Sequence, residues 1–212
     1  MSKVAVFDFD GVLAPSNQIK IDAFVEVLPV AETKLRELMR KMYDPGETRY
    51  EMFAAVLEKC GTAKEKIPGL VAGYAEQYNN LVQEYIAKHG AAPGVADILK
   101  NLHWAGYHLY VYSNTPAEAL RQTIKRLGIF ELFTDVLGRP TSKADNLRQV
   151  IEREGVDAVS VMVVGDGESD WKSAREVGCG FIGLRSKFNG WTEAEKFPTI
   201  NNIKELLEKI SQ

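Results

Sequence analysis

The 212-residue chain contains no apolar run that approaches the roughly 18 residues needed to span a bilayer, so the sequence predicts no membrane-spanning helix. Only two cysteines are present, Cys60 and Cys179, and their separation matches no metal-binding or redox motif. Two buried thiols are a better prediction than a disulfide. A strong excess of charge of either sign is also lacking: the formal net charge is -3, which gives no indication of a nucleic-acid or membrane partner.

Room for a signal peptide is lacking as well, because the first apolar run begins at Val4. Together with the cysteine content, this leads us to expect a cytoplasmic protein. The apolar content of 45% and the charged content of 26% are ordinary for a soluble globular protein. A chain of this length can bury one sizeable core, alone or with a small appended unit.

The first apolar run, Val4 to Phe7, predicts a strand buried on both faces, and it stops at Asp8-Phe9-Asp10-Gly11. Two carboxylates two residues apart, directly after a buried strand, are costly unless a cation or hydrogen-bond donors compensate them. An isolated Asp-x-Asp-Gly is equally compatible with a simple turn. Later stretches repeat the pattern of an apolar strand followed by polar residues, which favours a shared site.

Helical periodicity dominates from about residue 21 to residue 88, with no strand signal. We therefore predict a helical unit over residues 15–89, inserted into a domain made of residues 1–14 and 90–212. Residues 13–20 are expected to form a loop. The aromatic residues of this unit recur at helical spacing, which is typical of core packing.

From residue 90 onward strands and helices alternate, which predicts an α/β fold with right-handed crossovers onto a mostly parallel sheet. Residues 115–118 and 142–145 each have the pattern of a capped helix start. Residues 186–198 are expected to be a loop, before a closing helix. The five expected strands lie at residues 4–7, 107–112, 134–137, 159–164 and 181–184.

Ligands of open parallel sheets bind at the carboxyl ends of the strands. The first strand ends in Asp8 and Asp10, the second in Ser113 and the fourth in Asp166, with Asp170 following. Four carboxylates in one crevice would repel one another without a cation. Since every ligand on offer is a hard oxygen, the set selects Mg²⁺, which typically serves phosphoryl chemistry.

A phosphoryl group also needs donors, and Ser113 and Lys143 can supply them. Each has a plainer alternative. Ser113 could only begin a loop, Lys143 could be a solvent-facing residue at a helix start, and Asp170 could only enrich the first turn of its helix with negative charge.

Four stretches together resemble the motifs of the haloacid dehalogenase-like hydrolase superfamily, in the order of that family: Asp8-Phe9-Asp10-Gly11-Val12, Ser113-Asn114, Lys143, and Gly165-Asp166 followed by Asp170. They cover residues 3 to about 185. The resemblance implies a Rossmann-like, mostly parallel core of five strands. The helical insertion is similar to the α-helical cap of phosphoglycolate phosphatase-like and β-phosphoglucomutase-like members.

The resemblance implies that Asp8 is the nucleophile that forms an aspartyl-phosphate. Asp10 would be the general acid and later the general base, and its backbone carbonyl would also bind Mg²⁺. The dehalogenase branch of the family lacks an Asp at the position of Asp10. Its presence here therefore favours phosphoryl transfer over cleavage of a carbon–halogen bond.

The same resemblance implies that Ser113, assisted by Asn114, hydrogen-bonds the transferring phosphoryl group. Lys143 would neutralise charge on the nucleophile and on the substrate phosphate. Asp166 would ligate Mg²⁺, and Asp170 would ligate it directly or through water.

In the helical unit, Gly46-Glu47-Thr48-Arg49 is the one polar stretch with a possible substrate role. Arg49 could clamp a substrate anion bidentately. A solvated Arg near the start of a surface helix explains the pattern equally well.

We therefore expect Mg²⁺-dependent hydrolysis of a small phosphorylated metabolite through an aspartyl-phosphate, by a monomer or homodimer with no nucleic-acid or membrane partner. A sugar phosphomutase of the same architecture would use the same Asp pair. A binding protein on a retired scaffold is a further alternative, but retired sites usually lack a nucleophile or metal ligand, and none is missing here.

Overall fold

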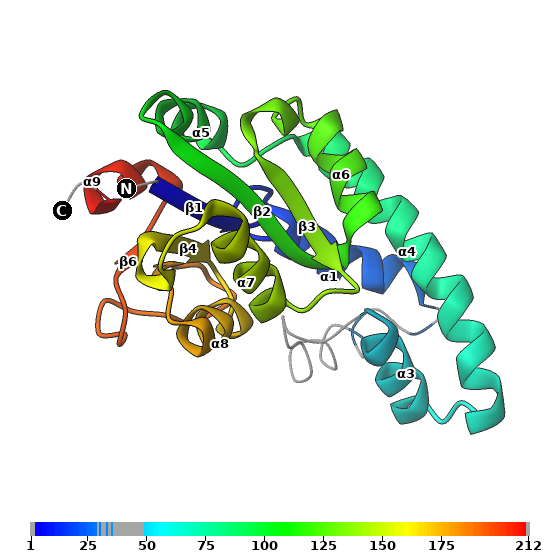
Figure 1. The fold of residues 1–212 in the computed structure, drawn as a ribbon. Helices are drawn as coiled ribbons and strands as arrows, with labels where there is room; N and C mark the ends of the chain where they lie inside the picture. The colour runs from blue at the N-terminus through cyan, green and yellow to red at the C-terminus, as the bar shows by residue number, and fades with distance from the viewer. Residues whose placement is uncertain (1–2, 29, 31–32, 34, 36–48, 211–212) are drawn as a thin grey trace. The chain divides into compact units, whose positions relative to one another are not determined.

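The computed structural model describes residues 3–28, 30, 33, 35 and 49–210 (Figure 1). It divides the chain into two compact units. One comprises Met1–Pro15 and Gly90–Gln212, and the other comprises Ser16–His89. The first unit holds the sheet and the second is helical.

The sheet has six strands in the order β3-β2-β1-β4-β5-β6, and every neighbouring pair is parallel. The predicted α/β fold with a mostly parallel sheet is confirmed, but the expected number of five strands was one too few. The sixth strand has two residues and follows the 186–198 loop, so it is too short to show an alternating pattern. The strands are β1 Lys3–Asp8, β2 Tyr107–Pro116, β3 Asp135–Arg139, β4 Val161–Gly165, β5 Gly180–Leu184 and β6 Thr199–Ile200.

Helices cover both faces of this sheet. The α-helices of the unit are α5 Val95–Trp104, α6 Ala117–Arg126, α7 Lys143–Glu154, α8 Glu168–Val177 and α9 Leu206–Ile210. Short 3-10 helices lie at Phe130–Leu132, Ala158–Ser160 and Ile203–Glu205. The step from β2 to β3 runs in the opposite direction across the sheet to the step from β4 to β5, so right-handed crossovers place α6 and α8 on opposite faces.

Helices α7 and α8 lie side by side on one face (Figure 1). Strand side chains alternate between the two faces, and those on this face meet apolar residues of both helices. The core formed there includes Val6, Tyr110, Leu147, Val163 and Ala174. Helix α6 packs against β2 and β3, and α5 packs against β2. Because the strands are covered on both sides, their apolar runs are nearly continuous.

The two predicted capped helix starts differ in outcome. Ser142 is the N-cap of α7 and its side chain accepts a hydrogen bond from the backbone N–H of Asp145, as the sequence predicts. The pattern at residues 115–118 was misleading: β2 continues through Pro116, which pairs with Arg139 of β3, and α6 begins without a side-chain cap. Strand pairing therefore prevails over the local capping pattern at this point.

The helical unit contains α1 Ser16–Val27, α3 Arg49–Lys59 and α4 Ile67–His89, with a 3-10 helix at Lys64–Lys66. The loop expected over residues 13–20 was wrong in its second half, because α1 begins at Ser16. Ser and Asn suit the first turn of a helix as well as a loop, since free N–H groups there need partners. Aromatic rings form the interior, with ring centroids of Phe24 4.5 Å from those of both Phe53 and Tyr78.

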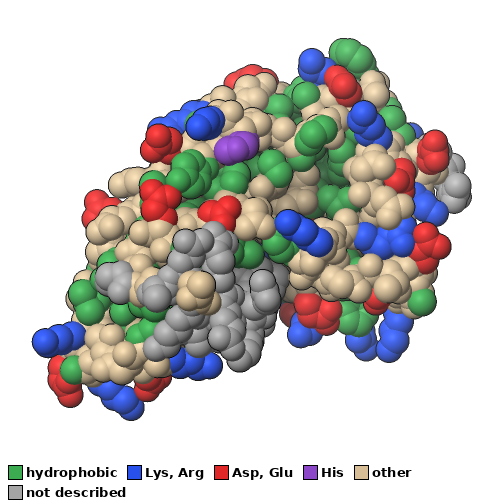
Figure 2. Space-filling model, turned by 180° about the vertical axis from the view of Figure 1, so that it is seen from behind, with side chains coloured by type: hydrophobic (Ala, Val, Ile, Leu, Met, Phe, Trp, Pro, Cys, Tyr) green, Lys and Arg blue, Asp and Glu red, His purple; other side chains and the backbone are tan. Residues whose placement is uncertain are grey.

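The surface carries no large field of one charge sign on the face that Figure 2 shows, where acidic and basic side chains are interspersed. None of the helices that the structure describes is long and apolar enough to cross a membrane.

Candidate active site

Three neighbouring strands deliver polar side chains to one edge of the sheet. Asp8 is the last residue of β1, which lies between β2 and β4. Strand β2 carries Ser113 and Asn114 near its end, and Asp166 directly follows β4. The convergence predicted from the strand ends is therefore present.

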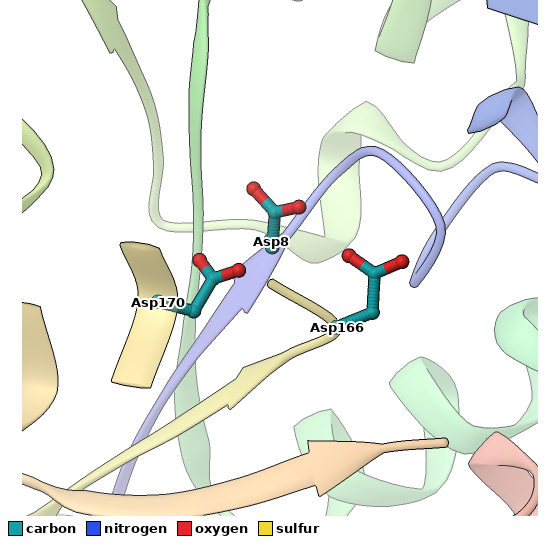
Figure 3. A group of neighbouring side chains, drawn as sticks. All are labelled: Asp8, Asp166 and Asp170. Carbon is teal, nitrogen blue, oxygen red and sulfur yellow. The ribbon is translucent and has the colours of Figure 1, made fainter. Parts of the chain in front are cut away.

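The carboxylates of Asp8, Asp166 and Asp170 form a buried group (Figure 3). Each offers one oxygen, and these oxygens all lie within 4.8 Å of one another. Exposed fractions are only 4% for Asp8, 6% for Asp166 and 1% for Asp170. The group draws on β1, the residue after β4 and the first turn of α8.

Asp170 also serves its own helix. Its Oδ2 accepts a hydrogen bond of 3.1 Å from the backbone N–H of Gly167, the N-cap residue of α8. Helix and strand approach closely here: a Cβ on Gly165 would lie 2.4 Å from the Cβ of Asp170. Only glycine at position 165 leaves room for this carboxylate. Asp170 therefore both stabilises the start of α8 and belongs to the buried group of carboxylates.

Lys143 lies between two of the carboxylates. Its Nζ donates to Asp8 Oδ1 at 2.9 Å and to Asp170 Oδ1 at 2.6 Å, and it sits 4.8 Å from the ring centroid of Tyr112. Burial on its own lowers the pKa of Lys143, but Asp170 and Asp8 more than offset it, so the pKa is raised. The alternative of a solvent-facing lysine is excluded, since the side chain is 8% exposed.

The ammonium of Lys143 contacts two of the three carboxylates, and the charged form of Asp8 remains disfavoured. Burial raises the pKa of Asp8 well above its usual value, the charge of Asp170 raises it further, and Lys143 only partly opposes them. Three buried carboxylate oxygens within 4.8 Å of one another form a site of hard oxygen ligands that a divalent cation can occupy. The donor set therefore fits Mg²⁺, with Asp8, Asp166 and Asp170 as the residues that would hold it.

Asp10 lies in the turn that follows β1. Gly11 adopts a φ of 80° there, and its N–H donates to the carbonyl of Ala14. The Ser113 hydroxyl donates to Asp10 Oδ2 at 3.2 Å and accepts from the N–H of Thr115 at 3.0 Å. Ser113 is thus placed beside Asp10, as expected for one site. The carboxylate of Asp10 is not one of the three grouped oxygens, and the metal role predicted for its backbone carbonyl stays a prediction.

The sequence matches the model of the haloacid dehalogenase-like hydrolase family over residues 5–184. The chain belongs to this family. A phosphoglycolate phosphatase from Vibrio cholerae is 26% identical over 203 residues, which cover 88% of this chain and 86% of that protein.

Two solved structures share the fold of this haloacid dehalogenase-like hydrolase. A predicted phosphoglycolate phosphatase from Haemophilus somnus has a TM-score of 0.80 at 20% identity and covers 100% of this chain and 98% of that chain. A protein from Thermotoga maritima, provisionally assigned as a β-phosphoglucomutase, has a TM-score of 0.76 at 19% identity, with 99% and 98% covered. At these identities the likeness shows the fold alone.

The predicted substrate residue Arg49 belongs to the helical unit of this hydrolase. It is the first residue of α3, and its guanidinium lies 5.6 Å from the ring centroid of Tyr50. Residues 46–48, flagged with it, lie outside the described residues. The role of Arg49 as an anion clamp stays a prediction.

One residue near the site of this hydrolase escaped the sequence analysis. Asn189, in the 186–198 loop, donates to the backbone carbonyl of Asp166 at 2.9 Å. The sequence signal that could have pointed to it is the dipeptide Asn189-Gly190, a strong turn pattern soon after the strand β5. Gly190 indeed has a φ of 64°.

Proposed function

We propose that this chain is a Mg²⁺-dependent phosphatase that hydrolyses a small phosphorylated metabolite through an aspartyl-phosphate on Asp8. The observation that carries the proposal is the buried group of Asp8, Asp166 and Asp170 with Lys143 between two of its members. The similarity to a phosphoglycolate phosphatase supports the phosphatase activity and makes a small phosphorylated acid the first substrate to test.

In the first half-reaction the carboxylate of Asp8 attacks phosphorus, and the bond from phosphorus to the leaving oxygen breaks. Asp10 gives its proton to that oxygen. In the second half-reaction Asp10, now a carboxylate, takes a proton from water as the water oxygen attacks the same phosphorus. The bond between phosphorus and Asp8 breaks, inorganic phosphate leaves, and both residues return to their starting states.

The remaining residues of the site hold charge and orientation. Lys143 fixes the Asp8 carboxylate and offsets negative charge that the phosphate brings. Ser113 holds Asp10 by a hydrogen bond before substrate arrives. Bound Mg²⁺ would supply the positive charge that keeps Asp8 ionised and screens the phosphoryl oxygens from it.

In this proposal the helical unit, Ser16–His89, acts as the cap that selects the substrate, with Arg49 as its anion-binding residue. The partner is a small molecule, the enzyme is a monomer or homodimer, and the site of action is the cytoplasm. A KM raised by Arg49→Ala, with kcat nearly unchanged, would support the assignment of Arg49.

The proposal is tested with Mg²⁺ and a panel of phosphoglycolate, sugar phosphates, nucleotides and an aryl phosphate. We expect release of inorganic phosphate from at least one small ester, and loss of about 1,000-fold or more of kcat in Asp8→Asn. Near-wild-type turnover by Asp8→Asn would remove the nucleophile assignment. An isomerised sugar phosphate without phosphate release would identify a phosphomutase instead.

A further inference from the structure

The loop between β5 and β6 contains a side chain that uses its full hydrogen-bonding capacity. Asn189 Nδ2 donates to the carbonyls of Asp166 at 2.9 Å and Leu184 at 2.8 Å. Its Oδ1 accepts from the N–H groups of Ser186 at 3.2 Å and Trp191 at 3.1 Å. An Asn amide has two donor hydrogens and two acceptor lone pairs, and here all are used.

The bond to Asp166 reaches the centre of the active site. The carbonyl of Asp166 and the N–H of Gly167 belong to one peptide unit, which is planar. Asn189 holds the carbonyl end of this unit, and the Asp170 carboxylate holds its N–H end at 3.1 Å. The orientation of this single plane therefore affects two of the three grouped carboxylates, Asp166 and Asp170.

The loop that carries Asn189 is itself anchored by packing. The ring of Phe197 lies 4.9 Å from that of Phe181 on β5, 5.1 Å from that of Trp191 and 5.5 Å from that of Trp171 on α8, measured between centroids. The N–H of Gly183 donates to the carbonyl of Pro198, which closes the loop onto the strand. Phe197 thus packs the loop that carries Asn189 against β5 and α8.

We infer that Asn189 is a positioning residue that orients the Asp166–Gly167 peptide, and through it the carboxylates of Asp166 and Asp170, for divalent-cation binding. This inference rests on the proposed metal site. It gives the 186–198 loop a function: the loop carries a backbone clamp for the metal ligands, held by Trp191 and Phe197.

Two variants test the clamp. In Asn189→Ser the hydroxyl is able to accept from the N–H of residue 191, which preserves the local turn, but it is too short to reach the carbonyls of Asp166 and Leu184. Asn189→Ala removes all four bonds. The matched control is Ser186→Ala in the same loop, which removes only the acceptor of the Phe188 N–H.

The measurement is direct binding of Mn²⁺, used as the probe for Mg²⁺, by electron paramagnetic resonance of the free ion. We expect the dissociation constant to rise by about 10- to 100-fold in both Asn189 variants and to change by less than about twofold in Ser186→Ala. Near-ultraviolet circular dichroism checks that each variant is folded. At low Mn²⁺ the weaker binding should also lower turnover in the Asn189 variants, and excess Mn²⁺ should restore much of it, which it would not do for an unfolded enzyme.

The outcomes separate the two proposals. If the wild-type protein does not bind Mn²⁺, the proposed function fails. If the wild-type protein binds Mn²⁺ and folded Asn189→Ser binds it equally well, the clamp is refuted while the proposed function stands.

Discussion

The two compact units bury different kinds of side chain. In the sheet-bearing unit, charged residues such as Asp8, Lys143 and Asp170 are buried together at one edge. In the described part of the helical unit the large buried side chains are apolar or aromatic, including Phe53 and Tyr78, and no group of three potential metal ligands is found there. Burial of the charged site lowers the stability of the first unit, whereas the second unit is stabilised by the packing of apolar and aromatic side chains. Substitutions at the charged site should therefore impair catalysis as well as stability, whereas substitutions in the interior of the helical unit should lower stability alone.

The largest effect is expected for Lys143→Met, which removes the ammonium but keeps most of the side-chain volume. We expect kcat to fall by about 100- to 1,000-fold, because charge at Asp8 and the substrate is no longer offset. Without Mg²⁺, stability should also fall by about 3–5 kcal/mol, since buried carboxylates lose their partner. Kinetics and urea denaturation measure the two effects.

Added Mg²⁺ provides the internal control for Lys143→Met. A cation bound at the carboxylates should recover a part of the lost stability, and the recovered free energy should grow with the logarithm of the Mg²⁺ concentration above the dissociation constant. If the variant turns over at the wild-type rate, Lys143 has no catalytic role, whatever its contacts.

A comparably large effect on stability, without one on the metal site, is expected for Phe53→Ala. Phe53 is fully buried, and its ring centroid lies 4.5 Å from that of Phe24 and 5.8 Å from that of Tyr78. Truncation should cost about 3–5 kcal/mol of the unfolding free energy. The affinity for Mn²⁺ of the folded variant should stay unchanged, because the grouped carboxylates of Asp8, Asp166 and Asp170 all lie in the other unit.

The control on the same helix is Tyr50→Ala. Tyr50 is 49% exposed, so its removal should cost less than about 1 kcal/mol. A weakened Mn²⁺ affinity in folded Phe53→Ala would contradict the proposal that metal binding depends on the sheet-bearing unit alone.

The contrast between the units also explains how far sequence reasoning reached. The sequence predicts that Asp8, Ser113 and Asp166 lie together, because the carboxyl ends of parallel strands meet at one edge of the sheet. A residue at the end of a predicted strand can therefore be assigned to that edge. The burial of Lys143 did not follow from this rule, because a helix start alone does not fix the direction of its side chain. In the structure the Lys143 side chain turns toward the site and donates hydrogen bonds to Asp8 and Asp170.

Other features had no such rule. Asn189 contacts backbone carbonyls, and those carbonyls carry no sequence signature, so only the Asn-Gly turn pattern hinted at it. The start of α1 at Ser16 was missed because helix N-termini and loops share polar residues. The side chains that line a substrate pocket are harder still to predict from the sequence. They come from helices in separate segments, and only the packing of those helices determines which side chains meet.

A smaller effect, on stability but not on chemistry, is expected for Asp135→Asn at the start of β3. Desolvation by itself raises the pKa of Asp135, but hydrogen bonds from Arg153, the N–H of Val136 and Arg121 outweigh it, so the pKa is lowered. The folded-state pKa thus lies below the unfolded value, and the stabilisation is present above about pH 4 and lost as the pH falls through the folded-state pKa.

Wild type should exceed Asp135→Asn by about 1–2 kcal/mol of unfolding free energy near pH 7, a modest figure because Arg153 is half exposed to solvent. The difference should shrink below about pH 4, as measured by urea denaturation across pH. Glu176→Gln, at an exposed ion pair with Arg148, is the control and should leave stability nearly unchanged. A difference that does not depend on pH would contradict the charge-based explanation.

The smallest effect is expected for Tyr112→Phe, beneath the charged site. Among the described residues the buried Tyr112 hydroxyl makes no hydrogen bond of good geometry, although Asp170 and Ser173 are close enough to affect its pKa. Burial, followed by the charges of Asp170 and Asp8, raises its pKa, so the phenol stays protonated. Removing the hydroxyl should change the unfolding free energy by less than about 1 kcal/mol, since no hydrogen bond of good geometry is lost.

The ring of Tyr112 is the part that should matter, because the Nζ of Lys143 lies 4.8 Å from its centroid. We therefore expect kcat of Tyr112→Phe to stay within about threefold of wild type, while Tyr112→Leu, which keeps an apolar side chain but loses the ring, lowers kcat by about tenfold. If Tyr112→Phe loses as much activity as Tyr112→Leu, the hydroxyl itself contributes to catalysis. The contact between the Tyr112 ring and Lys143 would then not account for the role of this residue.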